Sequence, residues 1–217
     1  MASERGRPRG FDTDAALDRA LAVFWRHGFQ SASLSELTEA MGVSKPSLYA
    51  AFGDKEALYL QALERYATQQ SAAHIAVLDA EPDGRRAVER YLRSIVTRLK
   101  DPALPGGCLV INGVADCGGP STPAAVELAL RKVLQGGEIK LRERLLRAQR
   151  DGQLAPDARV GDLAALFSSL VAGLGVLAKS GTKRAKLYAV ITAAMGAWPA
   201  LRASNVGRTK EITSEKT

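Results

Sequence analysis

The spacing of apolar residues along this chain constrains its fold more than any other feature. Between glycines, prolines and capping residues, nearly every interval repeats apolar side chains at three- or four-residue spacing, which is typical of a helix with one buried face. No interval shows a convincing strand-like alternation of apolar and polar residues. We therefore predict an all-α fold. The predicted helices span about residues 12–28, 33–42, 44–52, 54–78, 85–100, 108–117, 122–151, 160–179 and 183–202.

The charge of the chain is compatible with a polyanionic partner but does not identify one. The formal net charge is +7, and lysine and arginine side chains displace counterions from phosphate backbones. Much of the excess lies between Arg131 and Arg150, on a predicted helix where a solvated face is the simplest interpretation. A DNA-binding function therefore has to be argued from a motif.

The termini and the cysteines exclude several classes of protein. The N-terminus is polar and basic, and no run of about 18 apolar residues occurs, so we predict a cytoplasmic protein without a membrane segment. Cys108, Cys117, His27 and His74 are too few and too scattered for a metal site or a disulfide scaffold. We predict no metal and no cofactor.

The segment 33–56 carries the clearest functional pattern. Ser33, followed three residues later by Glu36, predicts a capped short helix that stops at Gly42, and Ser44 predicts the cap of a second one. Two short helices joined by a tight turn form a helix-turn-helix. Apolar residues of both helices can pack against the first helix, which leaves Ser44, Lys45, Ser47 and Tyr49 available to a duplex.

Residues 42–59, GVSKPSLYAAFGDKEALY, resemble the DNA-binding domain of the TetR family of transcriptional regulators, and the resemblance covers about residues 12–60. It implies that Lys55 contacts a phosphate. Many relatives have a polar residue where this chain has Ala50 and Ala51, so base reading would depend on Pro46, Ser47 and the N-terminal arm. The DNA contacts implied by the resemblance and by the arm are Arg7, Arg9, Ser33, Ser44, Lys45, Pro46, Ser47, Tyr49 and Lys55.

Each of these contacts has an alternative interpretation. Tyr49 could close the core of the small domain, and Lys55 could be an ordinary solvated lysine. The arm, Gly6-Arg7-Pro8-Arg9-Gly10, looks like the core of an AT-hook that inserts arginines into a narrow minor groove. A solubilising disordered tail is the alternative for the arm.

The resemblance also implies a domain organisation. A basic arm at 1–11 precedes a three-helix DNA-binding domain at 12–60, a larger effector-binding and dimerisation bundle at 61–202 and a disordered tail at 203–217. In the family the last two long helices form a four-helix dimer interface, and the small and apolar residues of 163–178 and 187–201 agree with this. The alternative is that both are core helices of a monomer. Charged substitutions such as Leu174→Arg and Ile191→Glu would test the interface.

The effector is expected inside the bundle formed by residues 85–178. Candidate ligand contacts are apolar or weakly polar residues of the predicted helices, and each could instead be core. They are Tyr91, Ile95, Cys108, Ile111, Asn112 and Phe167. We predict a homodimeric repressor that a small molecule releases from a palindromic operator by shifting the spacing of its two recognition helices.

Cys108 gives an alternative signal. The segment PGGCLVINGV at 105–114 resembles a subgroup of the family with a glycine-cysteine pair, and a cysteine at a helix start is a candidate thiolate sensor of electrophiles or oxidants. A small buried hydrophobe is the other interpretation. Cys117 would lie on the opposite face of the same predicted helix, so no internal disulfide is expected.

Two other classes compete with a regulator. An enzyme would need a nucleophile with a base, a metal cluster or a phosphate loop, and Gly106-Gly107-Cys108 has no such partner in the sequence. A sequence-independent architectural DNA-binding protein would explain the basic arm but not the large effector-like bundle. We predict that the chain is not an enzyme.

Overall fold

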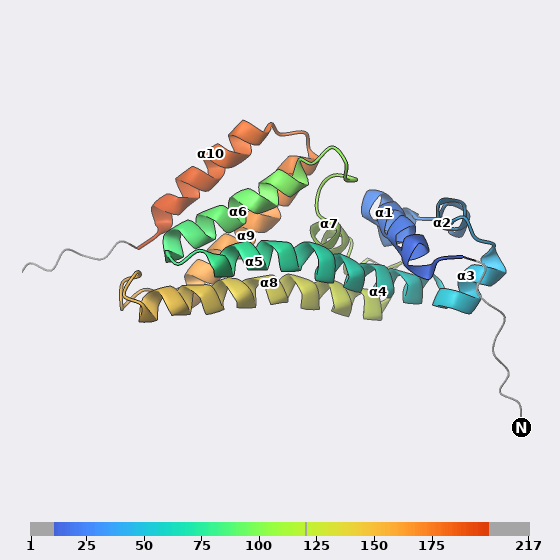
Figure 1. Cartoon of the computed structure of the whole chain (residues 1–217), viewed down its shortest axis with the longest axis horizontal. Coiled ribbons are helices and arrows are strands. Elements are labelled where there is room, and N and C mark those ends of the chain that lie inside the picture. Colours follow the sequence, from blue (N-terminus) through green and yellow to red (C-terminus); the bar gives the residue numbers. More distant parts are fainter. Residues whose placement is uncertain (1–10, 120, 200–217) are drawn as a thin grey trace, which may run out of the picture.

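The computed structural model describes residues 11–119 and 121–199, and every regular element in those ranges is helical. The chain is elongated, with α1, α2 and α3 gathered at one end and α6, α9 and α10 toward the other (Figure 1). The α4–α5 run and α8 lie side by side along the long axis. In order the elements are α1 (Thr13–Ser31), α2 (Leu34–Met41), α3 (Lys45–Phe52), α4 (Lys55–Tyr66), η1 (Ala67–Ser71), α5 (Ala72–Ala80), α6 (Gly84–Leu99), α7 (Leu109–Ala115), α8 (Ala124–Arg150), α9 (Val160–Lys179), α10 (Arg184–Ala194) and η2 (Met195–Ala197).

The predicted all-α fold is confirmed, and most predicted caps are where the sequence placed them. Asp12 caps α1 by accepting hydrogen bonds from two backbone amides, and Asp83 caps α6 by accepting one from the Arg86 amide. Gly28 interrupts α1 with a φ of 75° and a ψ of 177°. The predicted stop at Gly28 is therefore a kink, and the helical segment resumes and ends at Ser31.

The predicted continuous helix at 54–78 is wrong in one respect. The segment consists of α4, a π-helical turn η1 at Ala67–Ser71, and α5. No glycine or proline marks this turn, so the apolar periodicity did not reveal it. Wide turns of this kind inside α-helices are frequent at functional sites, and this one lines the cavity described below.

Other boundaries also need correction. The helix predicted at 108–117 is the shorter α7, with Cys108 as its N-cap residue and Cys117 beyond its end, so the two cysteines do not share a helix. Gly136 and Gly137 stay inside the continuous α8. The helix predicted at 183–202 ends at Ala194 and is followed by a single 3₁₀ turn. The predicted disordered tail lies outside the described residues.

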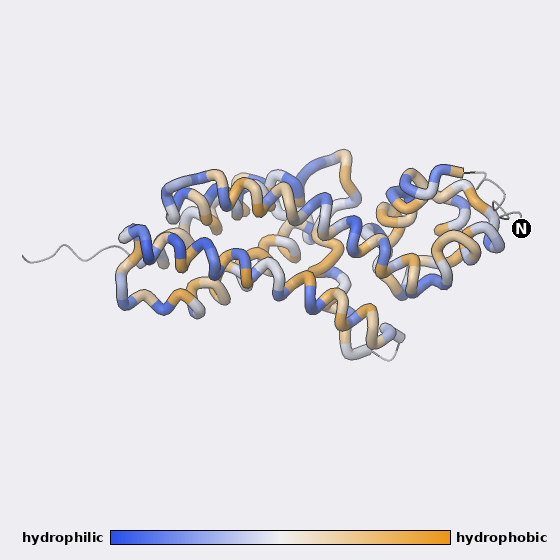
Figure 2. The backbone as a smooth tube through the Cα atoms, turned by 60° about the horizontal axis from the view of Figure 1, so that its bottom comes forward, coloured by the Kyte–Doolittle hydropathy of each residue, from blue (hydrophilic) through white to orange (hydrophobic). Residues whose placement is uncertain are grey.

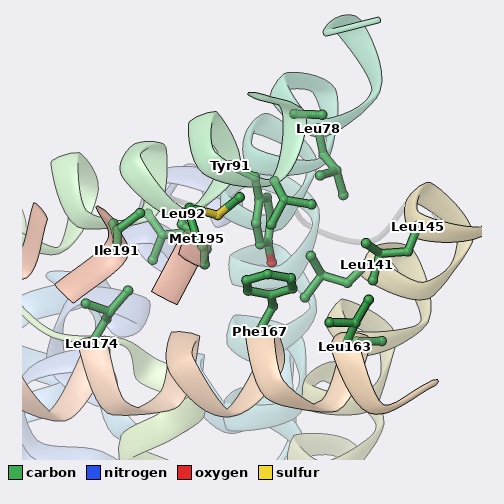
Figure 3. Close-up of a cluster of buried hydrophobic side chains, with 14 of the residues drawn as sticks. Leu78, Tyr91, Leu92, Leu141, Leu145, Leu163, Phe167, Leu174, Ile191 and Met195 are labelled. Carbon is green, nitrogen blue, oxygen red and sulfur yellow. The ribbon is translucent and has the colours of Figure 1, made fainter. Parts of the chain in front are cut away.

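Two clusters of buried side chains hold the described residues together. One joins α1–α4 to α7 and the start of α8 through Leu109, Val126 and Leu130. The other, shown in part in Figure 3, is built by α5, α6, α8, α9 and α10 around Phe167. Orange apolar stretches and blue polar ones follow one another along much of the tube in Figure 2. Burial of the first cluster ties α1–α4 to the rest of the chain.

Arg144 is the exception on the basic helix α8, whose other basic residues between 131 and 150 are exposed as predicted. Its side chain is only 2% exposed. Nε donates a hydrogen bond to the Leu78 carbonyl at 3.2 Å, and Nη2 donates to the carbonyls of Glu81 and Pro82 at 2.9 and 3.0 Å. The guanidinium therefore supplies donors for carbonyls at and just after the C-terminal end of α5 that no helix continues to satisfy.

Candidate nucleic-acid interface and internal cavity

Reciprocal hydrogen bonds fix the start of α2. The Ser33 hydroxyl accepts a hydrogen bond from the Glu36 amide at 3.1 Å, and the Glu36 carboxylate accepts one from the Ser33 amide at 2.8 Å. The hydrogen bond from the Ser33 amide is the main reason that the pKa of Glu36 lies below its usual value. The predicted capping box is confirmed, and it engages the Ser33 hydroxyl inside the domain.

A left-handed glycine makes the turn between α2 and α3. Gly42 has a φ of 68°, and its amide and that of Val43 donate hydrogen bonds to the last carbonyls of α2. A side chain at position 42 would meet no atom within 4 Å. Backbone conformation rather than space therefore requires glycine here.

The two faces of α3 differ in exposure. Leu48 and Phe52 are buried against the helices behind them, whereas Lys45, Pro46 and Tyr49 face solvent. Tyr49 is 48% exposed, so the alternative that it closes the core is wrong. A helix of eight residues held by one apolar face thus presents its other face outward.

The N-terminus of α3 has little backbone left to offer a phosphate. Ser44 accepts a hydrogen bond from the Ser47 amide at 3.2 Å, and their hydroxyls lie 2.8 Å apart. Pro46 has no N–H, which leaves the amide of Lys45 as the free donor in the first turn. Phosphate contacts at this end would therefore come from side chains more than from amides.

Lys55 is partly engaged within the domain. Its Nζ donates a hydrogen bond to the Gln30 carbonyl at 3.2 Å and lies 4.7 Å from the centre of the Phe29 ring. Burial lowers the pKa of Lys55 below its usual value. An ammonium group has three donors, so this geometry leaves donors for a phosphate, and Lys55 is not a freely solvated lysine. Arg7 and Arg9 lie outside the described residues.

Polar contacts connect α1 to the loops on either side of α7. The Trp25 indole donates a hydrogen bond to the Gly107 carbonyl at 3.1 Å, and the Gln30 amide donates one to the Thr122 hydroxyl at 2.9 Å. Within the small domain, Arg65 of α4 pairs with Asp14 and Asp18 of α1. A displacement of the bundle around Gly107 can therefore be transmitted to α1.

An internal cavity of about 630 Å³ lies between the two buried clusters. Its walls come from α1, α4, η1, α5, α6, α7, α8 and α9 and from the loop that carries Cys108. The exposed residues at its edge, among them Glu64, Thr68, Lys132 and Lys140, belong to the α4–η1 segment and to α8. The cavity was predicted to lie among the helices of residues 85 to 178. Its wall also includes residues between 25 and 75.

Four of the six predicted ligand contacts line this cavity, namely Tyr91, Ile95, Cys108 and Ile111. Phe167 is fully buried in the core, and Asn112 also does not line the cavity. Figure 3 shows Phe167 beside Tyr91 within the apolar cluster. The sequence prediction missed polar residues of the wall, namely Trp25, Tyr66, His74 and Arg98. Their common signal, a polar or aromatic residue on the apolar face of an amphipathic helix, does not by itself separate a cavity wall from a core.

Two of these residues, Tyr66 and His74, have pKa values far from their usual range. The Tyr66 hydroxyl donates a hydrogen bond to the Cys108 sulfur at 3.4 Å, and burial raises the pKa of Tyr66 well above its usual range. His74 Nδ1 lies 2.9 Å from the Ser94 hydroxyl. Burial, followed by the nearby charge of Arg98, lowers the pKa of His74 to about 4. His74 is therefore neutral at pH 7.

Large exposed apolar side chains mark a further surface on α8 and α9. They include Leu128 at 71%, Val176 at 59% and Ile139 at 54% exposure. Leu174 and Ile191, the residues selected from the sequence to test a dimer interface, are both fully buried within one protomer. The candidate interface therefore moves from α9 and α10 to α8 and α9.

Helix α9 is also long and apolar enough to cross a membrane by length and composition, a test that core helices of soluble proteins pass as well.

Comparisons with known proteins agree with this architecture. The sequence model described as bacterial regulatory proteins, tetR family, matches residues 16–62, and the one described as the tetracyclin repressor-like C-terminal domain matches residues 84–194. The HTH-type transcriptional repressor ComR of Escherichia coli (strain K12) is 34% identical over 198 residues, which cover 91% of this chain and 93% of ComR.

The uncharacterised HTH-type transcriptional regulator YezE of Bacillus subtilis (strain 168) is 30% identical over 177 residues, which cover 80% of this chain and 89% of YezE. A solved structure of a cysteine mutant of the TetR family regulator CifR, complexed with a 26-base-pair operator duplex, superposes with a TM-score of 0.85 at 42% identity. That match covers 89% of this chain and all of the CifR chain. These relatives are transcriptional regulators.

Proposed function

This chain belongs to the TetR family of bacterial transcriptional regulators, and from that premise we propose that it is a repressor that binds a pseudo-palindromic operator as a homodimer and leaves it when a small molecule fills the cavity. The exposed face of α3 carries the proposal. Leu48 and Phe52 hold the helix from behind, so Lys45, Ser47 and Tyr49 can enter a major groove together.

The division of labour among the proposed contacts follows their chemistry. Lys45 and Lys55 supply positive charge for phosphates, which fixes the register of the protein on the duplex. Pro46, Ser47 and Tyr49 present apolar and hydroxyl groups that can meet base edges or thymine methyl groups. Ser33 and Ser44 lie at the N-termini of α2 and α3, close to where a phosphate would pass. The arm with Arg7 and Arg9 would add minor-groove contacts.

Dimerisation would bring two copies of α3 to successive major grooves. Exposed leucine, isoleucine and valine side chains on α8 and α9 form a surface that a second copy of the chain would cover. Substituting Val176 by glutamate should produce monomers in sedimentation experiments, whereas Ala189→Glu on the exposed face of α10 should leave the dimer intact. An unperturbed Val176→Glu dimer would move the interface elsewhere.

The cavity is placed to act on the DNA-binding helices. Trp25 of α1 and Leu63 of α4 form part of its wall, and the Trp25 indole is bonded to the loop that precedes α7. A ligand that fits only one arrangement of these helices would favour one spacing of the two recognition helices over the other. The chain would thereby be a cytoplasmic regulator and not an enzyme.

Operator titration of point variants tests the proposed surface. Lys45→Ala, Tyr49→Ala and Lys55→Ala should each weaken binding to an operator duplex in an anisotropy titration while leaving the thermal unfolding transition in place. Lys186→Ala, an exposed lysine on α10, is the matched control and should bind as the wild type does. Wild-type affinity in all three variants would mean that α3 is not the recognition helix.

A thiol sensor is the second candidate function, because Cys108 lines the cavity and its sulfur accepts a hydrogen bond from the Tyr66 hydroxyl. An electrophile in the cavity would then react with Cys108. Both Cys108 and Cys117 are free thiols. Treatment of the wild type and of Cys108→Ser with a quinone should release the operator from the wild type alone; equal release from both would eliminate this candidate.

A further inference from the structure

A half-buried arginine without a carboxylate partner, Arg98, lies in the cavity wall. Nε of Arg98 is inaccessible to solvent and makes no hydrogen bond. Among residues 11–119 and 121–199, no carboxylate lies within 4.0 Å of its guanidinium. A guanidinium carries five N–H donors in a planar fork that matches a carboxylate. Because a half-buried charge has lost part of its hydration without gaining a partner, such a group is a candidate for pairing with a ligand.

The remaining charges of the wall do not cancel that of Arg98. Lys132, Lys140 and Glu64 line the cavity at its exposed edge, and Lys140 is already paired with Glu143 at 2.7 Å. His74 contributes no charge at pH 7, since burial and the nearby Arg98 hold its pKa at about 4. The cavity therefore has a positive interior, with its one acidic wall residue exposed at the edge.

The wall around Arg98 is otherwise apolar. Tyr91 and Ile95 precede Arg98 by seven and three residues on α6, so all three lie on one face of that helix and line the cavity together. Ile111, Val133 and Leu134 line it from α7 and α8. A volume of about 630 Å³ accommodates a small organic molecule with an apolar body.

We propose that the effector of this cavity is an organic carboxylate with an apolar body, whose carboxylate pairs with the Arg98 guanidinium while its body lies against Ile95, Ile111 and Leu134. The Tyr91 hydroxyl, on the same face of α6, is a second donor to that carboxylate. The inference rests on the proposed function, because it names the chemical class of the molecule that would release the operator.

Calorimetric titration of the full chain tests this assignment with matched pairs of ligands. The probes are 4-phenylbutyrate and octanoate, each compared with its primary amide, which has the same shape without the charge. At pH 7 at least one carboxylate should bind the wild type about tenfold or more tightly than its amide, because charge-assisted hydrogen bonds to a guanidinium exceed neutral ones.

Arg98→Gln should weaken carboxylate binding about tenfold and leave amide binding nearly unchanged, while Arg98→Lys should retain part of the preference. Arg142→Gln, an exposed arginine outside the cavity, is the matched control. Should Arg98→Gln fail to fold, the acid-to-amide ratio in the wild type and the Arg98→Lys variant still decide the matter. Equal binding of acid and amide, no binding of either acid, or an unchanged preference in Arg98→Gln would overturn the proposal.

A parallel operator titration separates this inference from the proposed function. If the protein binds an operator but no carboxylate, only the proposed ligand class is contradicted. A chain that binds the carboxylate through Arg98 without releasing the operator supports the ligand site and contradicts the proposed signalling. A chain that binds no operator contradicts the proposed function, whichever ligand it takes.

Discussion

The α2–α3 region and the internal cavity are built in opposite ways. In the first, short-range hydrogen bonds at Ser33, Gly42 and Ser44 fix two helices whose apolar faces are fully packed. In the second, mostly apolar side chains from helices far apart in sequence surround a cavity with a few polar groups in its wall, and Arg98 Nε has no partner. Close packing holds α2 and α3 in a single conformation, so the exposed face of α3 is fixed. The side chains of the cavity wall lack some packing and hydrogen-bond partners, and a ligand can supply them.

Two leucines on α4 give the largest expected effect and test this difference directly. Both lie in the first buried cluster and are almost inaccessible to solvent, but Leu63 also lines the cavity, whereas Leu58 does not. Leu58→Ala should lower the free energy of unfolding by about 3 to 5 kcal/mol, and Leu63→Ala by about 2 kcal/mol, because part of its surface already lacks packing partners. Urea denaturation at one fixed protein concentration gives both values. Equal losses would mean that the cavity wall is as well packed as the core.

Arg144 is a buried cation that has carbonyl partners, although its Nη1 makes no hydrogen bond, and removing it measures what those partners contribute to stability. Removing it in Arg144→Ala leaves the carbonyls of Leu78, Glu81 and Pro82 without their donor. We expect a loss of about 2 to 3 kcal/mol in unfolding free energy, compared with less than about 0.5 kcal/mol for the exposed neighbour Arg142→Ala. A loss of similar size in both variants would show that the cap of α5 contributes little.

His74 should give the cavity a pH dependence of its own. Its pKa in the folded chain is about 4, compared with about 6.5 in the unfolded chain. Between these values the unfolded state binds more protons, so stability is fully present above pH 6.5 and falls as the pH drops toward 4. The loss attributable to His74 should reach about 3 kcal/mol at pH 4. Thermal unfolding of the wild type and of His74→Asn from pH 7 to pH 4 measures it; parallel curves would contradict the assignment.

Replacing a glycine by alanine should give the smallest change in unfolding free energy, with opposite signs in the two regions. Gly42→Ala forces alanine into a φ of 68° and should cost about 1 kcal/mol. Gly137 lies inside the continuous helix α8 at the cavity wall, with no atom within 4 Å of an added Cβ. Gly137→Ala should therefore stabilise the chain by about 0.5 to 1 kcal/mol. Denaturation midpoints that move in the same direction would refute the difference.

The α2–α3 region could be predicted from sequence because its signals are local. The Ser33–Glu36 capping box, the Gly42 turn and the Ser44 cap are each contained within a few residues, and the structure confirms all three. Resemblance to a known family added the identity of the domain. Which of the named side chains contact DNA remains a prediction.

The cavity could be predicted only in part because the residues that form its wall are far apart in the sequence. Ile95 and Ile111 line it as predicted, but Phe167 is core, and nothing near Arg98 in sequence indicates that its Nε lies buried without a partner. The π-helical turn at Ala67–Ser71 contains no breaker residue, and the partners of Arg144 lie more than 60 positions away. Such features depend on tertiary packing rather than on local patterns.

The most direct test of the account is the affinity of the intact chain for a selected duplex compared with a scrambled duplex of the same length. The preferred sequence is first obtained by selection from a random pool, and both titrations are performed at one fixed salt concentration. We predict that the selected sequence is a pseudo-palindrome bound as a dimer about a thousandfold or more tightly than the scrambled duplex. Equal affinity for the two duplexes would contradict a sequence-specific regulator.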